Sequence, residues 1–294
     1  MSRPNPLPPH LLERAFRVTE ARDLGVPASR LRRSDLRRPT HGVRAGRDGG
    51  ASLVDALALV LRRDQRFSHL TAADIWGLPS PRDHEHARGP VHVATVGTAA
   101  LMRRRGVVAH RVRDSDTVVH RGLAVSSPAR TWAECAMLLG FRDLVAMGDH
   151  LVGRASLASV DDLAHALRPR GHGVVLARAA LAAIRVGSES PMETGMRLDI
   201  VEAGFPEPSL NVDVHDDDGQ FLGRVDMCWP GVRIALEYDG DHHRSRDAFR
   251  HDQRRANGFA VNGWLVIHAT AADAARPAVV FERLRQAFAE RARV

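Results

Sequence analysis

The sequence predicts an α/β protein with more than one domain. Strand-like runs such as VHVATV (91–96) alternate with runs of helical periodicity such as SLVDALALVLRR (52–63). The length of 294 residues exceeds the usual size of one domain, and 44% hydrophobic residues are enough to bury ordinary cores. Changes in pattern and charge along the chain predict three regions, 1–50, 51–186 and 187–294.

The first fifty residues predict three short helices and a small hairpin. LLERAF (11–16) has helical spacing, and Thr19 is a suitable N-cap for a second helix that stops at Gly25. Pro27 opens an arginine-rich third helix, PASRLRRSDL, and RRPTHGVRAG (37–46) follows as a possible wing. Helix, helix, turn, basic helix and wing form the order of a winged helix-turn-helix.

Arginine is concentrated in this N-terminal region. Residues 1–50 carry eleven arginines and five acids, and residues 30–47 carry seven arginines and the single acid Asp35. Guanidinium groups fit phosphates and guanine edges, so DNA contact is expected here. The candidate residues are Arg30, Arg32, Arg33, Arg37 and Arg38. The alternative is a solvated arginine-rich face, which is common in a protein without lysine.

The composition excludes several classes of function. All 42 basic residues are arginine, so Schiff-base chemistry and the phosphate-binding lysine of a P-loop are excluded. The two cysteines, Cys135 and Cys228, predict neither a disulfide framework nor a thiolate zinc site. The first residues lack the apolar core of a signal peptide, and Arg178 interrupts the longest apolar stretch. We therefore expect a cytoplasmic protein without a membrane segment.

The middle region, 51–186, is α/β in pattern and offers little chemistry. VHVATV and GVVAHRV predict strands, and SPARTWAECAMLL (127–139) begins a helix at Ser127 and Pro128. His84 and His86 flank Glu85 without the spacing of a helical zinc site, so we interpret them as loop histidines. Residues 157–186 predict two helices that pack against a neighbour or link domains.

The C-terminal region places several acids on neighbouring elements. Ser190, Pro191 and Glu193 begin a helix as a capping box, which gives Glu193 a structural role unless it also points into a site. Strands follow at LNVDV, FLGRVDMCW and VRIALEYDG, the last two joined by a turn at Pro230 and Gly231. Symmetric pairing about that turn places Asp226 opposite Ala235. Ala235, Glu237, Asp239 and Asp226 then share one face.

Such a group of carboxylates favours a divalent cation. Two carboxylates about 5 Å apart repel by roughly 3 kcal/mol at an effective dielectric constant of about 20. Oxygen ligands suit Mg²⁺ or Mn²⁺, so Asp226 and Glu237 are the candidate metal ligands. The alternating Ile234, Leu236 and Tyr238 predict that the opposite face is buried. The alternative is a merely charged sheet edge. The run DVHDDDG (213–219) does not fit a calcium loop and predicts a hairpin turn.

Five motifs in order between residues 188 and 268 carry a resemblance to a known family. SPMET, VDMCW, ALEYDGDHHR, FRHDQRR and NGWLVI resemble the PD-(D/E)xK nuclease superfamily, and most of all its very-short-patch-repair endonuclease-like branch. The resemblance implies a restriction-endonuclease-like core of element order αβββαβ. It also implies a metal-dependent DNA endonuclease, a hydrolase that acts on phosphodiester bonds.

The N-terminal 150 residues are more weakly similar to abortive-infection type IV antitoxin-like proteins. TEARDLGV, THGVRAG, SHLTAADIWGLP and VSSPARTWAECA match that pattern in order. The resemblance implies that the winged helix binds DNA. It leaves open whether a toxin is a partner, and the sequence does not reveal the oligomeric state.

The chain departs from the nuclease pattern at one position. The residue two after Glu237, where the superfamily carries lysine, is Asp239. By resemblance, Asp226 and Glu237 hold Mg²⁺, Glu193 supports the ion or orients the water, and Asp239 binds a second ion or orients His243. His243 is a candidate acid or base, because the usual pKa of histidine permits either role.

Two choices stay open at this point. Asp252 and Arg255 form an intrahelical ion pair or support the site. The function is an endonuclease or, alternatively, a DNA-binding regulator or antitoxin-like protein with an inactive nuclease fold. A nuclease acting on RNA cannot be separated from one acting on DNA by the sequence.

Overall fold

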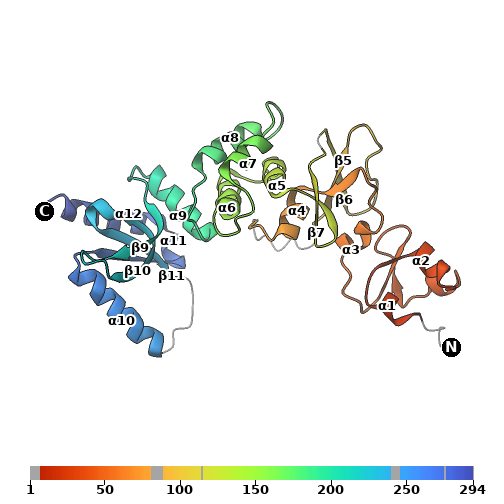
Figure 1. Cartoon of the computed structure of the whole chain (residues 1–294), viewed down its shortest axis with the longest axis horizontal. Helices are drawn as coiled ribbons and strands as arrows, with labels where there is room; N and C mark the ends of the chain where they lie inside the picture. Colours follow the sequence, from red (N-terminus) through yellow and green to blue (C-terminus); the bar gives the residue numbers. More distant parts are fainter. Residues whose placement is uncertain (1–6, 81–88, 114, 240–245, 275, 294) are drawn as a thin grey trace. The chain divides into compact units, whose positions relative to one another are not determined.

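The computed structural model describes residues 7–80, 89–113, 115–239, 246–274 and 276–293. The chain is a mixed α/β protein that divides into two units, Met1–Cys135 and Ala136–Val294 (Figure 1). The first unit contains a three-stranded and a five-stranded sheet, and the second contains a four-stranded sheet. The α/β class predicted from the alternating patterns is therefore confirmed.

The three-stranded sheet has the order β1-β3-β2. It consists of β1 (Phe16–Arg17), β2 (Leu36–Arg37) and β3 (Val43–Gly46), and β2 and β3 pair antiparallel where the wing was predicted. The helices α1 (Pro9–Leu12) and α2 (Val18–Asp23) complete this part. Its small core holds buried apolar side chains of α1, β1, α2 and β2 and of the segment between α2 and β2, including Leu11, Phe16, Ala21, Leu31 and Leu36.

Two predicted helices in this part are wrong in extent. The first ends at Leu12, because Phe16 enters β1 and pairs with Arg44. The basic helix expected over 27–36 is only the 3₁₀ turn η1 (Arg30–Arg32). The chain leaves the helical path at Arg33, whose ψ is 154°, and Leu36 then joins β2. Thr19 lies inside α2, whose N-cap is Arg17.

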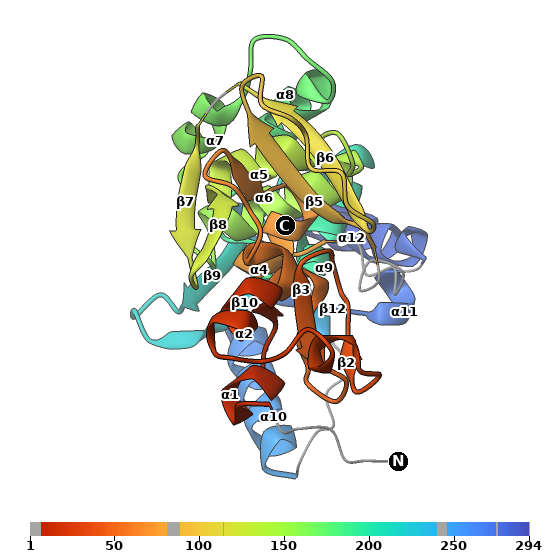
Figure 2. The same ribbon diagram turned by 90° about the vertical axis from the view of Figure 1, so that its right-hand side faces the viewer.

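The five-stranded sheet has the order β6-β5-β4-β8-β7. Its strands are β4 (Gln65–Phe67), β5 (Val91–Val96), β6 (Val107–Val112), β7 (Thr117–His120) and β8 (Leu123–Ser126). The helices of this part are α3 (Leu53–Ala58), α4 (His69–Trp76) and α5 (Pro128–Cys135). Figure 2 shows the parallel pair β5 and β6 and the hairpin of β7 and β8. Strands at 91–96 and 107–112 agree with the sequence prediction.

The second unit begins with helices and ends with the four-stranded sheet. Its helices are α6 (Phe141–Val152), α7 (Val160–Ala166), α8 (Val174–Ala183), α9 (Pro191–Glu202), α10 (Arg246–Val261), α11 (Ala271–Ala274) and α12 (Pro277–Arg291). Helices α7 and α8 are the two that were predicted within 157–186. The sheet consists of β9 (Ser209–His215), β10 (Phe221–Trp229), β11 (Ile234–Asp239) and β12 (Leu265–Thr270) in the order β12-β11-β10-β9.

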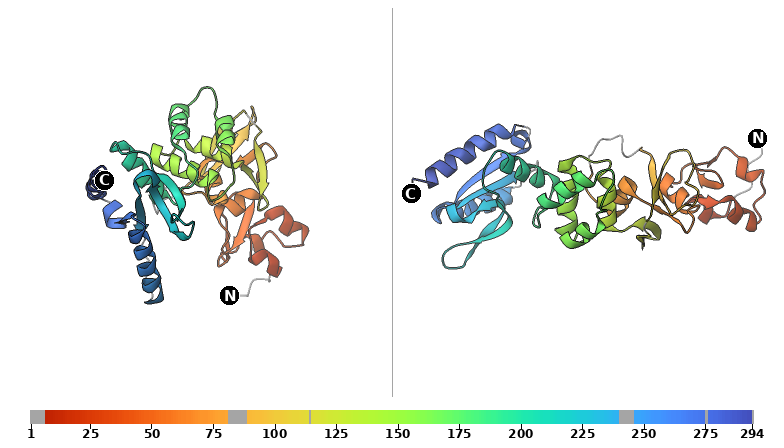
Figure 3. Two further views of the ribbon diagram at one scale, coloured as in Figure 1. Left: turned by 60° about the vertical axis from the view of Figure 1, so that its left-hand side comes forward. Right: turned by 90° about the horizontal axis from the view of Figure 1, so that it is seen from above.

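This sheet carries an apolar cluster on each face. On one face Ile234 and Leu236 pack with residues of α9 and α12, and Tyr238 packs against the same cluster. The predicted burial of this face is confirmed. On the other face Ala235 packs with Phe259 of α10. Figures 1 and 3 show α10 and α12 beside this sheet. The elements α9, β9, β10, β11, α10 and β12 follow the predicted order αβββαβ.

The connections and helix lengths settle two further predictions. DVHDDDG forms the turn between β9 and β10, in which the Asp216 N–H and the Gln220 C=O are hydrogen-bonded at 2.9 Å. Over the described ranges, every helix is too short or too polar to cross a membrane.

Candidate active site

The hairpin of β10 and β11 determines where Asp226 lies. Cys228, not Asp226, pairs with Ala235, so the predicted register is wrong by two residues. The connection is longer than the predicted two-residue turn, because it comprises the 3₁₀ turn η3 (Pro230–Val232) and Arg233 in a left-handed conformation at φ 49°. A shift by two residues preserves the alternation of side chains and moves Asp226 towards Glu237.

The sheet is irregular at Asp226. Its Oδ2 accepts a hydrogen bond of 2.7 Å from the Tyr238 N–H, so a side chain takes the place of a strand partner. On the other side of β10, Asn211 of β9 has a left-handed backbone at φ 47°, which asparagine tolerates better than most residues. Such backbone positions concentrate at functional sites.

At this irregularity, the side chains of β9 and β10 that follow it point to the opposite face of the sheet from those that precede it. Val212 and Val225 pack in the cluster of Phe259, whereas Leu210 and Met227 pack in the cluster on the opposite face. In a regular strand, residues two apart share a face. The break in alternation therefore lies at Asn211 and Asp226.

Glu193 caps α9 and also contacts β9. Its backbone N–H and its Oε1 are both bonded to the Ser190 hydroxyl, which completes the cap of α9. Its Oε2 accepts hydrogen bonds of 2.9 Å from the Glu189 N–H and from Asn211 Nδ2. Glu193 is 8% exposed. The cap thus holds this carboxylate rigidly on the β9 side of Asp226.

Glu237 forms an ion pair with Arg255 of α10. Arg255 Nη1 donates to Glu237 Oε2 at 2.9 Å, and Nη2 donates to Oε1. The same Nη2 donates to the Arg224 carbonyl at 2.6 Å, and the guanidinium lies 5.3 Å from the ring centre of Phe259. Arg255 therefore pairs with Glu237 of β11, and the side chain of Asp252, its predicted intrahelical partner, lies outside the described residues.

Gly223 makes room for this arginine. A Cβ at this position would lie 2.5 Å from Arg255 Nε and 3.1 Å from a ring carbon of Phe259. Real Cβ atoms do not approach so closely, so any other residue at 223 would displace the arginine. The glycine in FLGRVDMCW is thus part of the site.

The charges of the three acids act on one another. Burial raises the pKa of Asp226 above its ordinary value, and the negative charges of Glu193 and Glu237 raise it further. The Tyr238 N–H and the Arg255 charge act in the opposite direction. Glu193, Asp226 and Glu237 are therefore close enough to interact. The Arg255 guanidinium neutralises part of the negative charge of these acids, for which the sequence predicted a metal ion.

His268 is a member of this site that the sequence argument missed. It pairs with Glu237 in the parallel register of β11 and β12, and its Nδ1 lies 3.8 Å from Glu237 Oε2. Its side chain is half-exposed. The motif NGWLVIH contains this histidine, but only the strand order shows that it lies beside Glu237.

For three other predicted site residues the structure describes the backbone alone or nothing. Asp239 pairs in register with Thr270, and its side chain lies outside the described residues, as does that of Asp252 on α10. His243 is also outside the described residues. Among the residues that are described, the acids do not bring three ligand atoms within 4.8 Å of one another.

The predicted DNA-binding arginines divide into two groups. Arg30 is 6% exposed and donates to Asp35 at 2.9 and 2.6 Å. Arg37 donates to the carbonyls of Gly46, Gly49 and Ala51. These two side chains hold the three-stranded sheet and its connections. Arg32, Arg33, Arg37 and Arg38 are exposed, and of these Arg37 is the one bonded to the backbone carbonyls named above.

Arg38 lies in a basic pocket of the first unit. The pocket has a volume of about 650 Å³. Six arginines line it, namely Arg22, Arg38, Arg44, Arg103, Arg104 and Arg105. Arg104 donates to the His41 carbonyl at 2.7 Å and thereby joins the RRR segment to the wing. The run of three arginines at 103–105 is visible in the sequence, and its proximity to the wing is not.

Comparison with known proteins gives a distant similarity. The chain is 29% identical over 149 residues to two proteins of Mycobacterium tuberculosis, uncharacterized protein MT2308 of strain CDC 1551 and uncharacterized protein Rv2248 of strain H37Rv. The match covers 50% of this chain and 54% of each relative, so the chain spans about half the length of the curated relatives it matches. No family model matches the chain. No solved structure matches it.

Proposed function

We propose that this chain binds DNA and hydrolyses phosphodiester bonds with the help of Mg²⁺ or Mn²⁺. One observation carries the proposal: the carboxylates of Glu193 on α9, Asp226 on β10 and Glu237 on β11 interact at an irregular point of the sheet. Clustered carboxylates are characteristic of sites for hard cations.

The donor set fits such an ion. Asp226 and Glu237 would hold it with carboxylate oxygens, and Glu193 is positioned by its cap to orient a water molecule. A bound divalent ion would polarise the scissile phosphate and lower the pKa of a bound water. Arg255 bonds both oxygens of Glu237, so metal binding requires the guanidinium to give up at least one of them. His243 and His268 are the candidate acids or bases.

The first unit supports contact with a polyanion. The order α1, β1, α2, η1, β2, β3 fits the predicted winged helix with a shortened third helix. The basic pocket beside the hairpin of β2 and β3 offers exposed guanidinium groups, which bind phosphates well. Arg32, Arg33 and Arg38 are the remaining candidates from the predicted set, and Arg103 and Arg105 join them.

A second candidate function is DNA binding without hydrolysis, as in a regulator or an antitoxin-like protein. The bidentate pair of Arg255 with Glu237 favours it, because that pair already satisfies one of the two candidate metal ligands. The lysine position of the nuclease pattern is also occupied by Asp239. Both candidates share the DNA-binding unit and differ in whether the acids hold a metal.

The test is cleavage of supercoiled plasmid in the presence of Mg²⁺ or Mn²⁺. We expect Asp226→Asn and Glu237→Gln each to lower the cleavage rate by at least about 100-fold, because each removes a metal ligand. Asp213→Asn is the matched control, since Asp213 is a half-exposed acid on the neighbouring strand β9. Its cleavage rate should stay at the wild-type value.

The second candidate predicts a different result. If the wild type binds DNA but cleaves no supercoiled, nicked, mismatched or single-stranded DNA with either ion, hydrolysis of DNA is excluded. Arg255→Met then distinguishes two causes of inactivity. A gain of metal-dependent cleavage would show that the arginine blocks the site, and continued inactivity would leave the DNA-binding function alone. Parallel assays with RNA test the remaining substrate class.

A further inference from the structure

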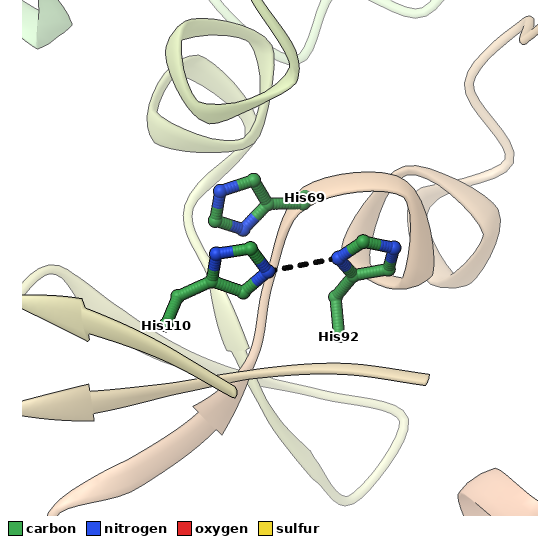
Figure 4. Close-up of side chains that lie close together, drawn as sticks. All are labelled: His69, His92 and His110. Carbon is green, nitrogen blue, oxygen red and sulfur yellow. Dashed lines mark hydrogen bonds between the residues drawn. The ribbon is translucent and has the colours of Figure 1, made fainter. Parts of the chain in front are cut away.

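Three histidines that are distant in the sequence meet in the first unit (Figure 4). His69 is the first residue of α4, His92 lies on β5, and His110 lies on β6. Ala94 pairs with His110 in the parallel register, so His92 and His110 are two positions apart and share a face of the sheet. His92 Nδ1 and His110 Nε2 are 2.9 Å apart.

His69 closes the group from the helix side. Its ring stacks on that of His110, with the ring centres 3.7 Å apart and the planes 20° from parallel. Its backbone is left-handed at φ 51°, which is uncommon outside glycine and costs free energy. One nitrogen from each ring lies within 4.8 Å of the other two. The fold therefore holds His69 in an unfavourable conformation that directs its ring onto the other two.

A buried polar network supports His69 from behind. Its Nδ1 lies 3.0 Å from Ser68 Oγ and 3.9 Å from Glu134 Oε2. Glu134 in turn accepts hydrogen bonds from Ser126 Oγ at 2.9 Å and from Arg66 Nη2 at 3.2 Å. Nδ1 is thus turned to the Ser68 hydroxyl, with the Glu134 carboxylate beyond it. Polar groups bonded to the far side of a histidine ring commonly fix the orientation of a histidine that binds a metal.

The group lies mostly inside the first unit. His69 is 2% exposed and His92 is 7% exposed. His110 is half-buried, which leaves an approach to the group from solvent.

We infer that His69, His92 and His110 form a binding site for a divalent transition metal ion, with Zn²⁺ as the expected occupant. Three imidazoles suit zinc, whereas Mg²⁺ and Mn²⁺ prefer the oxygen ligands of the carboxylate cluster. Nitrogen ligands at about 2.0 to 2.1 Å from zinc in a tetrahedral arrangement are roughly 3.3 Å apart. The ligand nitrogens now lie within 4.8 Å of one another, so a bound ion requires the rings to adjust to that separation.

The site leaves a fourth coordination position for water or another ligand. A site with three protein ligands and one open position has the composition of a catalytic rather than a structural zinc site. The ligands come from α4, β5 and β6, so the ion would also connect the helix to the edge of the five-stranded sheet. The histidine site lies on a different sheet from the carboxylate site and uses a different type of ligand for a different ion. It is independent of the proposed hydrolase activity.

The test uses the full-length protein without an affinity tag, freed of metal by a chelator. Titration with Co²⁺ should give the intense visible bands of a tetrahedral site at one equivalent. Zn²⁺ should displace them and raise the melting temperature, because it binds the native state. We expect His92→Gln and His110→Gln each to weaken Zn²⁺ binding by more than about 100-fold.

The controls separate this site from other histidines. His120→Gln removes a ring that stacks on Trp76 in the same unit and should leave binding unchanged. The double variant His84→Gln, His86→Gln removes the histidines of the nearby HEH sequence and should also bind one equivalent. Circular dichroism and the melting temperature of each metal-free variant verify that it is folded.

Two results would overturn the inference. The first is a folded wild type that binds no stoichiometric Co²⁺ or Zn²⁺ at neutral pH, which would leave the three rings with a packing role only. The second is binding that survives in His92→Gln and His110→Gln but disappears in the His84, His86 double variant.

Discussion

Asp226 is a side chain whose charge is disfavoured in the second unit. Burial and the neighbouring carboxylates of Glu193 and Glu237 raise its pKa above the ordinary value. The native state therefore binds this proton more tightly than the unfolded chain does. By linkage, the contribution of Asp226 to stability falls as the pH rises from below the ordinary pKa through the native one, and above that range the full cost is present.

The variant Asp226→Asn tests this cost. The amide oxygen can still accept the Tyr238 N–H, and the buried charge is removed. We expect the variant to melt at a higher temperature than the wild type at pH 7, with the difference shrinking as the pH is lowered towards 4. Thermal unfolding across that range, without divalent ions, measures it. Asp213→Asn should show no such gain, and a lower melting temperature of Asp226→Asn at pH 7 would contradict the argument.

For single residues, the sequence predicted the positions of Asp226 and Glu237 better than it predicted which side chains contact them. Alternation along a strand places Glu237 on the face opposite Leu236, and the hairpin brings Asp226 near it even though the register was wrong by two residues. Arg255 and His268 reach Glu237 from α10 and β12. Those contacts depend on the strand order and on the space above Gly223, which no local pattern encodes.

A buried ion pair joins two elements of the second unit. Asp149 of α6 and Arg197 of α9 are each 1% exposed, and Asp149 Oδ2 accepts from Arg197 Nη2 at 2.9 Å. The same carboxylate accepts from the Thr194 hydroxyl at 2.8 Å and from the Arg185 N–H at 2.7 Å. Removing one partner of a buried pair leaves the other charge without its counterion.

We expect Asp149→Ala to destabilise the protein by about 3 to 5 kcal/mol. Urea unfolding followed by circular dichroism measures the change. Arg142→Ala is the control, because Arg142 contacts Asp199 and Glu202 of α9 from an exposed position and such pairs contribute about 1 kcal/mol or less. Equal losses in the two variants would show that the buried pair does not hold α6 to α9.

Secondary structure was predictable where local patterns agree with tertiary contacts. The strands β5 and β6 are rich in β-branched residues and β10 ends at the predicted turn, and the predicted positions of all three are confirmed. The basic helix predicted at 27–36 is wrong in extent, because the backbone becomes extended at Arg33 and Leu36 pairs in β2. In short segments, one tertiary contact outweighs helical propensity.

At the scale of the whole molecule, charge is unevenly distributed along the chain. Residues 1–50 carry eleven arginines and five acids, whereas residues 201–250 carry five arginines and eleven acids. A basic region that binds phosphates releases counterions, so affinity falls as salt rises. The division into two units at Cys135 and Ala136 separates these two parts of the chain.

We expect the affinity for duplex DNA to fall with salt with a logarithmic slope of about −4, which corresponds to four or five phosphate contacts. The double variant Arg103→Ala, Arg105→Ala should reduce the slope to roughly −2, because two exposed arginines of the basic pocket are lost. Fluorescence anisotropy at several NaCl concentrations gives both values. Arg285→Ala, an exposed arginine of the second unit, is the control. A wild-type affinity that does not change with salt would exclude this mode of binding.

Gly223 determines how strongly the acids can attract an ion, although it carries no side chain. A methyl group there would clash with Arg255, and the displaced guanidinium would bind Glu237 less well, although no formal charge changes. The cluster would then carry one more uncompensated negative charge and attract dissolved cations more strongly. Under the proposed function, Gly223→Ala would therefore favour metal binding at Glu237 by weakening the ion pair that competes with it.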